Sequence, residues 1–331
     1  MSKYQSIQKM NTNLNKMDKL RIVFMGTPDF AVATLDKLFH NSYNIVGVVT
    51  APDKPAGRGR KLNESAVKKY TTTQHIKVLQ PTNLKNEVFL EELSSLKPNL
   101  IIVVAFRMLP KVVWNLPKYG TFNLHASLLP NYRGAAPINW AIINGETETG
   151  ATTFFIDDKI DTGEIILQER TTIANNDTAG DLHDNLMELG ANLVLKTVKL
   201  IEEGTIAPIK QEETKELKPA HKIHKETCRI NWELPLDDIY NHIRGLSPYP
   251  TAWTNLTNDD KTVPVKIYLV AKKLEEHNLK NGALVATKKE LKVAVKDGFI
   301  ILLEIQLPGK RKMDIKDVLN GLKLSEKAHV L

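Results

Sequence analysis

Several features that define large classes of protein are scarce or missing in this sequence. Its 331 residues include one cysteine, Cys228, which excludes an internal disulfide and any metal site built from several thiolates; a plain structural cysteine suits a reducing cytosol. The longest apolar runs, at 101–106 and 299–305, have the length of strands and are far shorter than a membrane span of roughly 20 residues. Internal repeats are also missing. We therefore expect a cytoplasmic protein with no membrane contact.

The amino-terminal segment lacks the apolar core of a secretory signal peptide, and it contains no arginine, which argues against a transit peptide. Residues 1–18 are instead rich in Asn, Lys, Gln and Ser without helical periodicity. We expect them to form a disordered extension, with the fold beginning near Lys19. Met17 is then a candidate for the true initiator methionine.

The remaining composition is that of an ordinary globular protein, with 42% hydrophobic and 25% charged residues. A chain of this length exceeds the usual size of one domain, so we expect two domains. The net charge of +7 is unevenly distributed: residues 1–204 contain 23 basic and 21 acidic side chains, whereas residues 205–331 contain 22 and 17. This positive excess favours a polyanionic partner, although a lysine-rich solvated face would have the same composition.

Strand-sized apolar runs alternate with helical patterns from Leu20 to Glu203, which predicts an α/β sheet. The run LIIVVA at 100–105 is apolar throughout, as expected of a central parallel strand. The first turn lacks the G-x-G-x-x-G pattern, and Pro28 stands where a second glycine would let a pyrophosphate approach, so we exclude a dinucleotide site. The predicted strands are 20–25, 44–50, 78–79, 100–105, 121–125, 149–156 and 164–170, and the predicted helices are 31–39, 64–74, 83–96, 137–144 and 178–203.

A loop dense in cations follows the second predicted strand. Residues 51–62, APDKPAGRGRKL, are too rich in glycine and proline for regular structure, and they carry four basic side chains against one acid, Asp53. At the carboxyl edge of an α/β sheet, where ligands bind, such a loop is suited to contacting phosphates. A solvated connector is the alternative. The four basic residues are Lys54, Arg58, Arg60 and Lys61.

The segment TFNLHASLLPNYRGAAP, residues 121–137, carries the strongest chemical signal. Asn123 and His125 are two residues apart on a predicted strand, so they share a face near its carboxyl end. An amide and an imidazole placed there can donate hydrogen bonds to one oxygen, and the imidazole can also move a proton; acyl transfer needs both functions. The alternative is a turn-closing asparagine and a satisfied, half-buried histidine. Asp161, in an acidic loop at 157–163 that matches no calcium-binding pattern, is a candidate carboxylate partner.

The sequence changes character after Gly204. Residues 205–227 are polar and rich in lysine, which predicts a linker, and the short strands with tight turns that follow are typical of a small β-barrel. His221, His224 and Cys228 lack a convincing fourth ligand, so we do not expect a zinc site. The predicted strands are 263–270, 282–286, 291–295 and 299–305.

Taken together, these motifs closely resemble the methionyl-tRNA formyltransferase family. The resemblance implies a Rossmann-like formyltransferase domain with a parallel-type sheet at 19–204, a linker at 205–227 and a small, OB-like β-barrel that binds tRNA at 228–331. The implied reaction transfers a formyl group from 10-formyltetrahydrofolate to the α-amino group of methionine on initiator tRNA. The motifs that carry the resemblance are GTPDF, PDKPAGRGRKL, NLHASLLPNYRGAAPI, DTGEI, DTAGDLHDNLMELGA, RINW and IRGLSPYPTAW.

The resemblance also implies roles for individual residues. The catalytic trio matches Asn123, His125 and Asp161. The resemblance implies neither a metal nor a redox cofactor, and we expect a monomer. Arg58 matches the family's tRNA-contacting arginine, and we expect Lys54, Arg60 and Lys61 of the same loop to bind the tRNA with it. The folate-contacting loop matches Ser127, Leu128, Leu129 and Pro130.

Other functions stay open at this point. The NLHASLLP and DTG motifs are shared with other enzymes that use formyl-tetrahydrofolate and act on a purine precursor or an amino-sugar nucleotide. The purine enzymes lack a comparable second domain, and the PAGRGRKL loop favours tRNA over a sugar nucleotide. A non-catalytic RNA-binding homologue is a further alternative, against which the intact trio argues.

Overall fold

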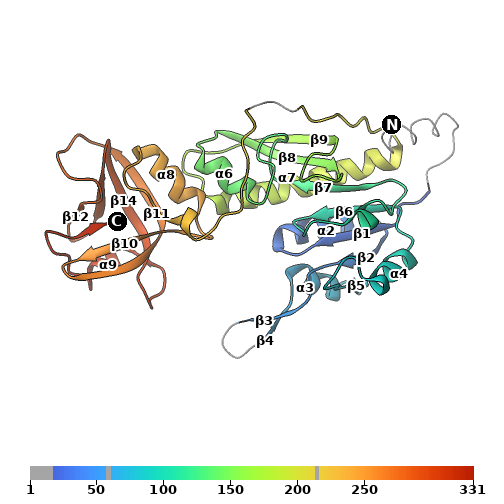
Figure 1. The fold of residues 1–331 in the computed structure, drawn as a ribbon, viewed down its shortest axis with the longest axis horizontal. Coiled ribbons are helices and arrows are strands. Elements are labelled where there is room, and N and C mark those ends of the chain that lie inside the picture. Colours follow the sequence, from blue (N-terminus) through green and yellow to red (C-terminus); the bar gives the residue numbers. More distant parts are fainter. Residues whose placement is uncertain (1–17, 57–60, 213–215) are drawn as a thin grey trace. The chain divides into compact units, whose positions relative to one another are not determined.

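The computed structural model describes residues 18–56, 61–212 and 216–331, so the expected extension at 1–18 lies outside the described residues except for Asp18. The chain forms two compact units (Figure 1). The first unit comprises the residues up to 133 with 150–170 and 185–217, and the second comprises 134–149, 171–184 and 218–331.

A seven-stranded sheet organises the first unit, in the order β5-β2-β1-β6-β7-β8-β9. Strands β5, β2, β1, β6 and β7 are parallel, and β8 runs antiparallel to β7, which confirms the predicted α/β class with a mostly parallel sheet. β1 and β6 are buried along their whole length, because a continuous apolar run suits a strand that is covered on both faces. The bounds are β1 Ile22–Gly26, β2 Ile45–Val49, β5 Val78–Leu79, β6 Leu100–Val104, β7 Thr121–His125, β8 Glu148–Phe155 and β9 Ile165–Thr172.

Helices cover both faces of this sheet. Leu93 of α4 and Val113 of α5 share one apolar core with Ile101 of β6. On the opposite face, α7 approaches β7 so closely that a Cβ at Gly190 would lie 2.8 Å from Leu124 Cδ2, so a larger residue there would require the Leu124 side chain to shift. The bounds are α2 Asp29–His40, α3 Ala66–Thr73, α4 Glu87–Ser95, α5 Lys111–Trp114 and α7 Ala179–Glu203.

The long helix α7 begins with a reciprocal cap. Thr178 Oγ1 accepts a hydrogen bond from Asp181 N at 3.2 Å, and Asp181 Oδ2 accepts one from Thr178 N at 2.8 Å. The hydrogen bonds from the Thr178 hydroxyl and main chain lower the pKa of Asp181. Among the described residues, no helix combines the length and the apolar character of a membrane span.

The cationic loop differs from the prediction that it lacks regular structure. β3 (Lys54–Ala56) pairs antiparallel with β4 (Lys61–Asn63), so its two ends form a short ladder. Proline is tolerated here because each strand of an isolated pair has one free edge, and a residue facing that edge needs no N–H donor. The prediction from the glycine- and proline-rich composition was therefore wrong for the two ends of the segment, which form strands.

An antiparallel, nearly closed β-barrel forms most of the second unit. Its strand order is β12-β13-β14-β11-β10-β16, with β15 paired to β14. The barrel closes where Val330 N donates to Gly282 O at 2.9 Å and Leu284 N donates to Ala328 O at 3.2 Å. This confirms the predicted small barrel; β10 and β16 were not predicted as strands. The bounds are β10 Ala252–Asn258, β11 Lys261–Leu274, β12 Leu284–Ala286, β13 Leu291–Val295, β14 Gly298–Gln306, β15 Met313–Asp314 and β16 His329–Val330.

Helix α8 (Leu236–Gly245) was also not predicted. Its buried residues Leu236, Ile239, Tyr240 and Ile243 recur at helical spacing and belong to the barrel core. The carbonyl of Gly245 accepts a hydrogen bond from the Asn139 amide at 2.7 Å, which joins α8 to α6 (Pro137–Ile143). The remaining helical elements of the described unit are the 3-10 turn Glu226–Cys228 and α9 Ile315–Leu319.

Candidate active site

β7 presents Asn123 and His125 on one face at its carboxyl end, as the two-residue spacing predicts. β7 lies between β6 and β8, and Asn123 is paired with Val103 on one side and Phe154 on the other. His125 is buried, whereas Asn123 is partly exposed. Within the described part of the chain, the Asn123 carboxamide makes no hydrogen bond, so its donors are available to a ligand.

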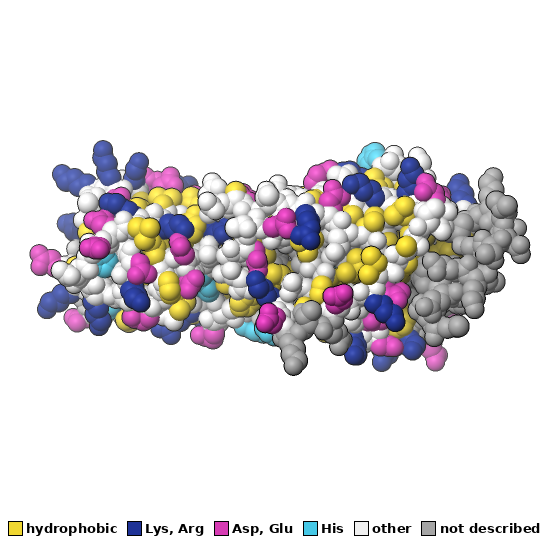
Figure 2. Space-filling model, turned by 90° about the horizontal axis from the view of Figure 1, so that it is seen from above, with side chains coloured by type: hydrophobic (Ala, Val, Ile, Leu, Met, Phe, Trp, Pro, Cys, Tyr) yellow, Lys and Arg dark blue, Asp and Glu magenta, His cyan; other side chains and the backbone are white. Residues whose placement is uncertain are grey.

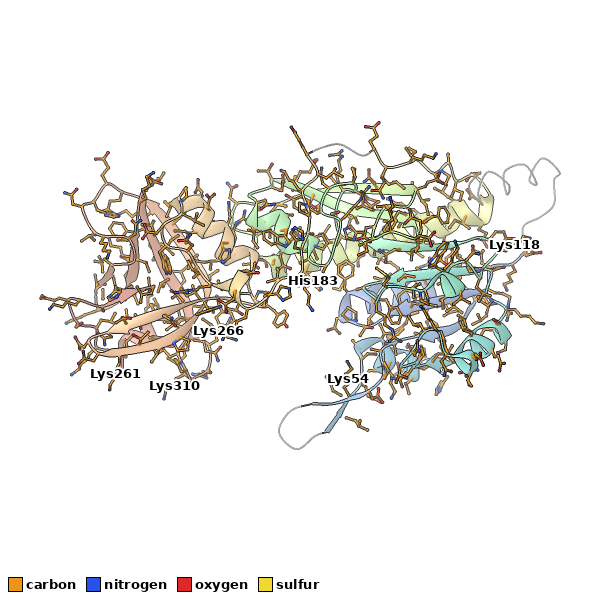
Figure 3. The ribbon with its side chains drawn as sticks, in the orientation of Figure 1. Lys54, Lys118, His183, Lys261, Lys266 and Lys310 are labelled. Atoms are coloured by element: carbon orange, nitrogen blue, oxygen red, sulfur yellow. The ribbon has the colours of Figure 1, made fainter. Side chains whose placement is uncertain are left out.

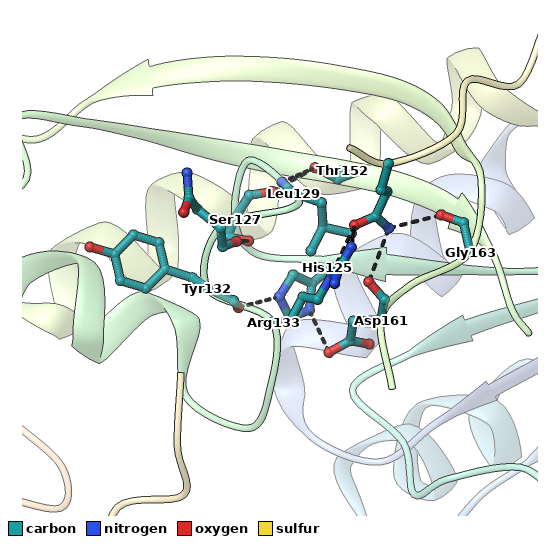
Figure 4. A network of polar contacts seen from close by, with 10 residues as sticks. His125, Ser127, Leu129, Tyr132, Arg133, Thr152, Asp161 and Gly163 are labelled. Atoms are coloured by element: carbon teal, nitrogen blue, oxygen red, sulfur yellow. Dashed lines mark hydrogen bonds and ion pairs between the residues drawn. The ribbon is translucent and has the colours of Figure 1, made fainter. Parts of the chain in front are cut away.

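Both ring nitrogens of His125 face oxygen atoms (Figure 4). Nε2 lies 2.8 Å from the Tyr132 carbonyl oxygen, and Nδ1 lies 3.8 Å from Asp161 Oδ2. A carbonyl oxygen only accepts hydrogen bonds, so Nε2 carries a proton. The lone pair of Nδ1 in the neutral ring therefore faces Asp161, and a proton bound there would create an imidazolium beside a carboxylate. The ring of Phe154 packs edge-on against the imidazole, with 6.4 Å between centroids.

The three aspartates of the acidic loop have different surroundings. Asp157 folds the loop: its Oδ1 accepts hydrogen bonds from Lys159 N at 2.9 Å and Thr162 Oγ1 at 2.8 Å. Asp158 is exposed, and only Asp161 turns toward His125, with 16% of its side chain exposed. Among the described residues, no group of His, Cys, Asp and Glu side chains could hold a metal ion.

The backbone of this loop is tightly constrained around Asp161. Asp161 has φ of +54°, in the left-handed region that is unfavourable for a residue with a Cβ atom. Two residues later, a Cβ at Gly163 would lie 1.6 Å from the Phe155 carbonyl oxygen, so glycine is required for the loop to approach β8. The D-T-G order therefore has a steric reason as well as a chemical one.

The Ser127–Pro130 loop is rigidly attached to β8. Ser127 Oγ donates to Asn131 O at 2.7 Å, and Thr152 Oγ1 donates to Ser127 O at 2.6 Å. Leu129 N donates to Thr152 Oγ1 at 3.2 Å. Ser127 and Leu129 are buried, so the side chains with surface to offer a ligand are those of Leu128 and Pro130.

Two glutamines and an arginine complete the network, and sequence reasoning missed all three. Gln168 Nε2 donates to Leu129 O at 2.8 Å. Arg133 Nη2 donates to Gln211 Oε1 at 2.6 Å, and Gln211 Nε2 donates to Asp161 O at 2.9 Å and to Gly163 O at 2.8 Å. Arg133 stands inside the YRG motif, which was a usable signal. Gln211 lies in the segment interpreted as a linker, where no periodicity marks it.

Comparison with known proteins identifies the family. A formyl transferase family model matches residues 20–198, and a model of the formyl transferase C-terminal domain matches residues 222–323. Over 315 residues the chain is 58% identical to methionyl-tRNA formyltransferase of Flavobacterium johnsoniae, covering 95% of this chain and 100% of that protein. The chain belongs to the methionyl-tRNA formyltransferase family. The resemblance read from the motifs is thereby confirmed.

Further relatives agree with the family assignment. Methionyl-tRNA formyltransferase of Bacteroides thetaiotaomicron is 54% identical over 316 residues, or 94% of this chain and 98% of that protein. The solved structure of WlaRD, described as a sugar 3N-formyl transferase in the presence of dTDP and 5-N-formyl-THF, matches with a TM-score of 0.62 and 23% identity, covering 89% of this chain and 100% of WlaRD. At that identity the match shows a shared fold only.

In this member of the family, the cationic loop is described only at its ends. Lys54 is exposed on β3, whereas Arg58, Arg60 and the side chain of Lys61 lie outside the described residues. Asp53 does not neutralise the loop cations among the described residues, because Lys68 of α3 pairs with it and Gln80 Nε2 donates to its Oδ1 at 2.8 Å. Hydrogen bonds from Lys68 and Gln80 lower the pKa of Asp53.

The barrel of the second unit carries exposed cations. Lys and Arg side chains are mixed with Asp and Glu on the surface shown in Figure 2 rather than gathered in one patch. Many are paired, such as Lys312 with Glu304 at 2.7 Å. Within the described residues, Lys261, Lys266 and Lys310 are exposed and form no ion pair with a carboxylate (Figure 3). These three are the barrel cations that we single out as available to a polyanion.

The histidine- and cysteine-containing segment before α8 has structural contacts. Cys228 is buried, its Sγ donates to His224 O at 3.3 Å, and burial raises the pKa of its thiol. His221 and His224 are exposed. The main chain of Ala220 nearby accepts a hydrogen bond from Ala135 N at 2.8 Å. The segment therefore contributes packing and main-chain contacts to the second unit.

Proposed function

We propose that this chain transfers the formyl group of 10-formyltetrahydrofolate to the α-amino group of methionyl initiator tRNA, making formylmethionyl-tRNA for translation initiation. The observation that carries this proposal is the 58% identity to a methionyl-tRNA formyltransferase over the whole length of that protein. The matches to both the formyl transferase model and its C-terminal domain model support it, because they extend over both parts of the chain.

The proposed reaction is attack of the methionine amine on the formyl carbon. A nitrogen–carbon bond forms and the carbonyl electron pair moves to oxygen. The oxygen pair then re-forms the carbonyl as the bond to N10 of the folate breaks, and N10 takes the electron pair of that bond and the proton that His125 has removed from the amine. We assign the developing oxyanion to the carboxamide of Asn123, which makes no hydrogen bond to the described residues. His125 Nδ1 takes the amine proton, and Asp161, 3.8 Å away, stabilises the imidazolium.

The folate donor is assigned to the Ser127–Pro130 loop. The side chains of Ser127 and Leu129 are buried, so contact would come from the side chains of Leu128 and Pro130 and from main-chain atoms. The hydrogen bonds to Thr152 and Gln168 hold this loop in place before a ligand arrives, which lowers the cost of ordering it. WlaRD was crystallised in the presence of 5-N-formyl-THF, which is consistent with a folate donor in this fold.

The tRNA is assigned to cations in two places. One is the β3–β4 segment, with Arg58, Lys54, Arg60 and Lys61; the other is the exposed lysines of the barrel. We propose domains at 19–204 and 228–331 with a linker at 205–227, and we propose that the chain acts as a monomer.

The deciding experiment offers the purified protein formyl-tetrahydrofolate with charged initiator tRNA and, separately, with an amino-sugar nucleotide. We expect formylation of the charged tRNA and none of the sugar. Formylation of the sugar alone would replace the proposal with the sugar-nucleotide function. Binding of tRNA without any formyl transfer would indicate a non-catalytic RNA-binding protein.

A further inference from the structure

We propose that Gln211 is a positioning residue for formyl transfer: its side chain holds the 161–163 loop so that Asp161 faces Nδ1 of His125. This inference rests on the role proposed above for Asp161. Gln211 itself is assigned no contact with substrate. It lies outside the loops that carry the catalytic trio, on the segment that follows α7.

The amide of Gln211 has its full complement of hydrogen bonds. Nε2 donates to Asp161 O at 2.9 Å and to Gly163 O at 2.8 Å, and Oε1 accepts from Arg133 Nε at 3.0 Å and Nη2 at 2.6 Å. Carbonyl oxygens only accept and a guanidinium only donates, so the orientation of the amide is fixed by its partners. Among the common side chains of this length, glutamate lacks the two donors and methionine lacks both donors and acceptor.

Gln211 contacts a turn whose backbone conformation is unfavourable at Asp161. A φ of +54° at Asp161 is unfavourable for a residue with a side chain, and such conformations persist when neighbouring contacts impose them. The bonds to the Asp161 and Gly163 carbonyls span this turn on both sides of Thr162. Because the Asp161 carboxylate is 3.8 Å from Nδ1, a small rotation of the turn would change its interaction with the ring.

Through Arg133, the same side chain is also linked to the residue that contacts the other ring nitrogen of His125. Arg133 follows Tyr132, whose carbonyl oxygen lies 2.8 Å from Nε2 of the imidazole. Gln211 thus links the segment that contacts Nε2 to the loop that contacts Nδ1. A single amide therefore connects the partners of both ring nitrogens; Figure 4 labels Tyr132, Arg133, Asp161 and Gly163 beside His125.

Gln211 is itself anchored by the main chain. Ile209 N donates to Ile165 O at 2.8 Å, and Ile165 N donates to Ile209 O at 2.8 Å, so the segment is joined to the beginning of β9. Ile165 is two residues beyond Gly163. Gln211 and the 161–163 loop are consequently both fixed to β9. This geometry is suited to positioning.

Two substitutions test the inference, with formylation of charged tRNA as the assay. Gln211→Leu removes the donors and the acceptor, and Gln211→Glu keeps an acceptor for Arg133 while removing the donors to the carbonyls. We expect kcat to fall by about 10- to 100-fold in both variants, with the KM for the folate within about threefold of wild type, since small misplacements of catalytic groups have effects of this size. The control is Glu212→Gln, an exposed neighbour, which should leave kcat unchanged.

A double variant separates positioning from mere structural support. If Gln211 acts through Asp161, Gln211→Leu should have little further effect on kcat in an Asp161→Asn background, because the two changes remove one function. Multiplicative losses would overturn the inference, as would unchanged kcat in both single variants. Loss of cooperative thermal unfolding in both single variants would assign Gln211 to folding and also overturn it. A normal Asp161→Asn enzyme would instead refute the role proposed for Asp161.

Discussion

His125 in the first unit and His242 in the second are both enclosed by protein, yet their surroundings differ. Both ring nitrogens of His125 face oxygen atoms, and the Asn123 amide, which has no hydrogen-bond partner in the described part of the chain, lies on the same strand face. His242 lies on α8, where burial lowers its pKa and Nε2 is buried without a hydrogen-bond partner among the described residues. Burial is therefore common to both histidines. The features that support the role proposed for His125 are the nearby carboxylate and, among the described residues, the donor of Asn123 that has no partner.

The exposed cations of the barrel also differ from the groups proposed for catalysis. The roles proposed at the end of β7 fall on single side chains, each fixed by neighbours. The barrel instead offers separate exposed lysines, Lys261, Lys266 and Lys310, and no one of them has a distinctive setting among the described residues. A function concentrated in one residue should be lost with it, whereas a distributed function should weaken gradually.

The sharpest test of the histidine comparison is His125→Ala. We expect formyl transfer to fall by about 10²- to 10⁴-fold, because the variant loses the proposed general base, while the thermal unfolding midpoint changes little. Steady-state assays with charged initiator tRNA measure the loss. His242→Gln is the matched control and should retain activity. Near-normal turnover in His125→Ala would remove this residue from the mechanism.

Asn123→Ala should have the next largest effect. Removing one donor to a developing oxyanion typically lowers kcat by about 10²- to 10³-fold, and the exposed part of this carboxamide has no partner in the described protein that would rearrange. Single-turnover rates with saturating tRNA isolate the chemical step. Asn175→Ala, in an exposed loop, serves as the amide control. If both variants reacted at the same rate, the oxyanion would have to be assigned to other donors.

Much of the fold and of the candidate site could be predicted from the sequence, because the patterns that indicate them are local. Continuous apolar runs identified the central strands, and the two-residue spacing placed Asn123 and His125 on one face. The approach of Asp161 was expressed in the D-T-G order, since the aspartate needs a left-handed backbone and Gly163 needs to lack a Cβ. Backbone requirements of this kind restrict which residue can occupy a position, so they can be recognised in the sequence.

Other parts could not be predicted because they depend on distant partners. Gln211 contacts residues about 50 and 80 positions earlier, so no local pattern reveals it. The β3–β4 ladder forms inside a segment whose glycines and prolines argue against strands. By contrast α8 did have a local signal, the spacing of Leu236, Ile239 and Ile243, and the interpretation of the second domain as strands alone overlooked it.

Protonation of His242 should have a smaller effect, which is on the thermal stability of the protein at low pH. Its folded pKa lies below the ordinary value, so the unfolded state binds more protons, and the stability contributed by the neutral ring is fully present above about pH 6.5 and declines below it. From about pH 7.5 to pH 5.5, the wild-type unfolding midpoint should fall by about 2–4 °C more than that of His242→Gln. Parallel pH profiles for the two proteins in calorimetry would show that another group is responsible.

The smallest single-residue effect should come from the barrel cations. Lys266→Gln removes one exposed charge that has no carboxylate partner among the described residues, so tRNA affinity should weaken a few-fold and the slope of log K against log salt should fall by about 1. Removing Lys261, Lys266 and Lys310 together should reduce that slope further. The control is Lys118→Gln in the first unit, where the ammonium is 2.9 Å from Asp18 Oδ2. Filter-binding titrations at several salt concentrations measure both quantities. One lysine alone could instead account for the whole loss of affinity seen in the triple variant. The barrel would then depend on a single side chain, as is proposed for β7, and the contrast between the two units would be wrong.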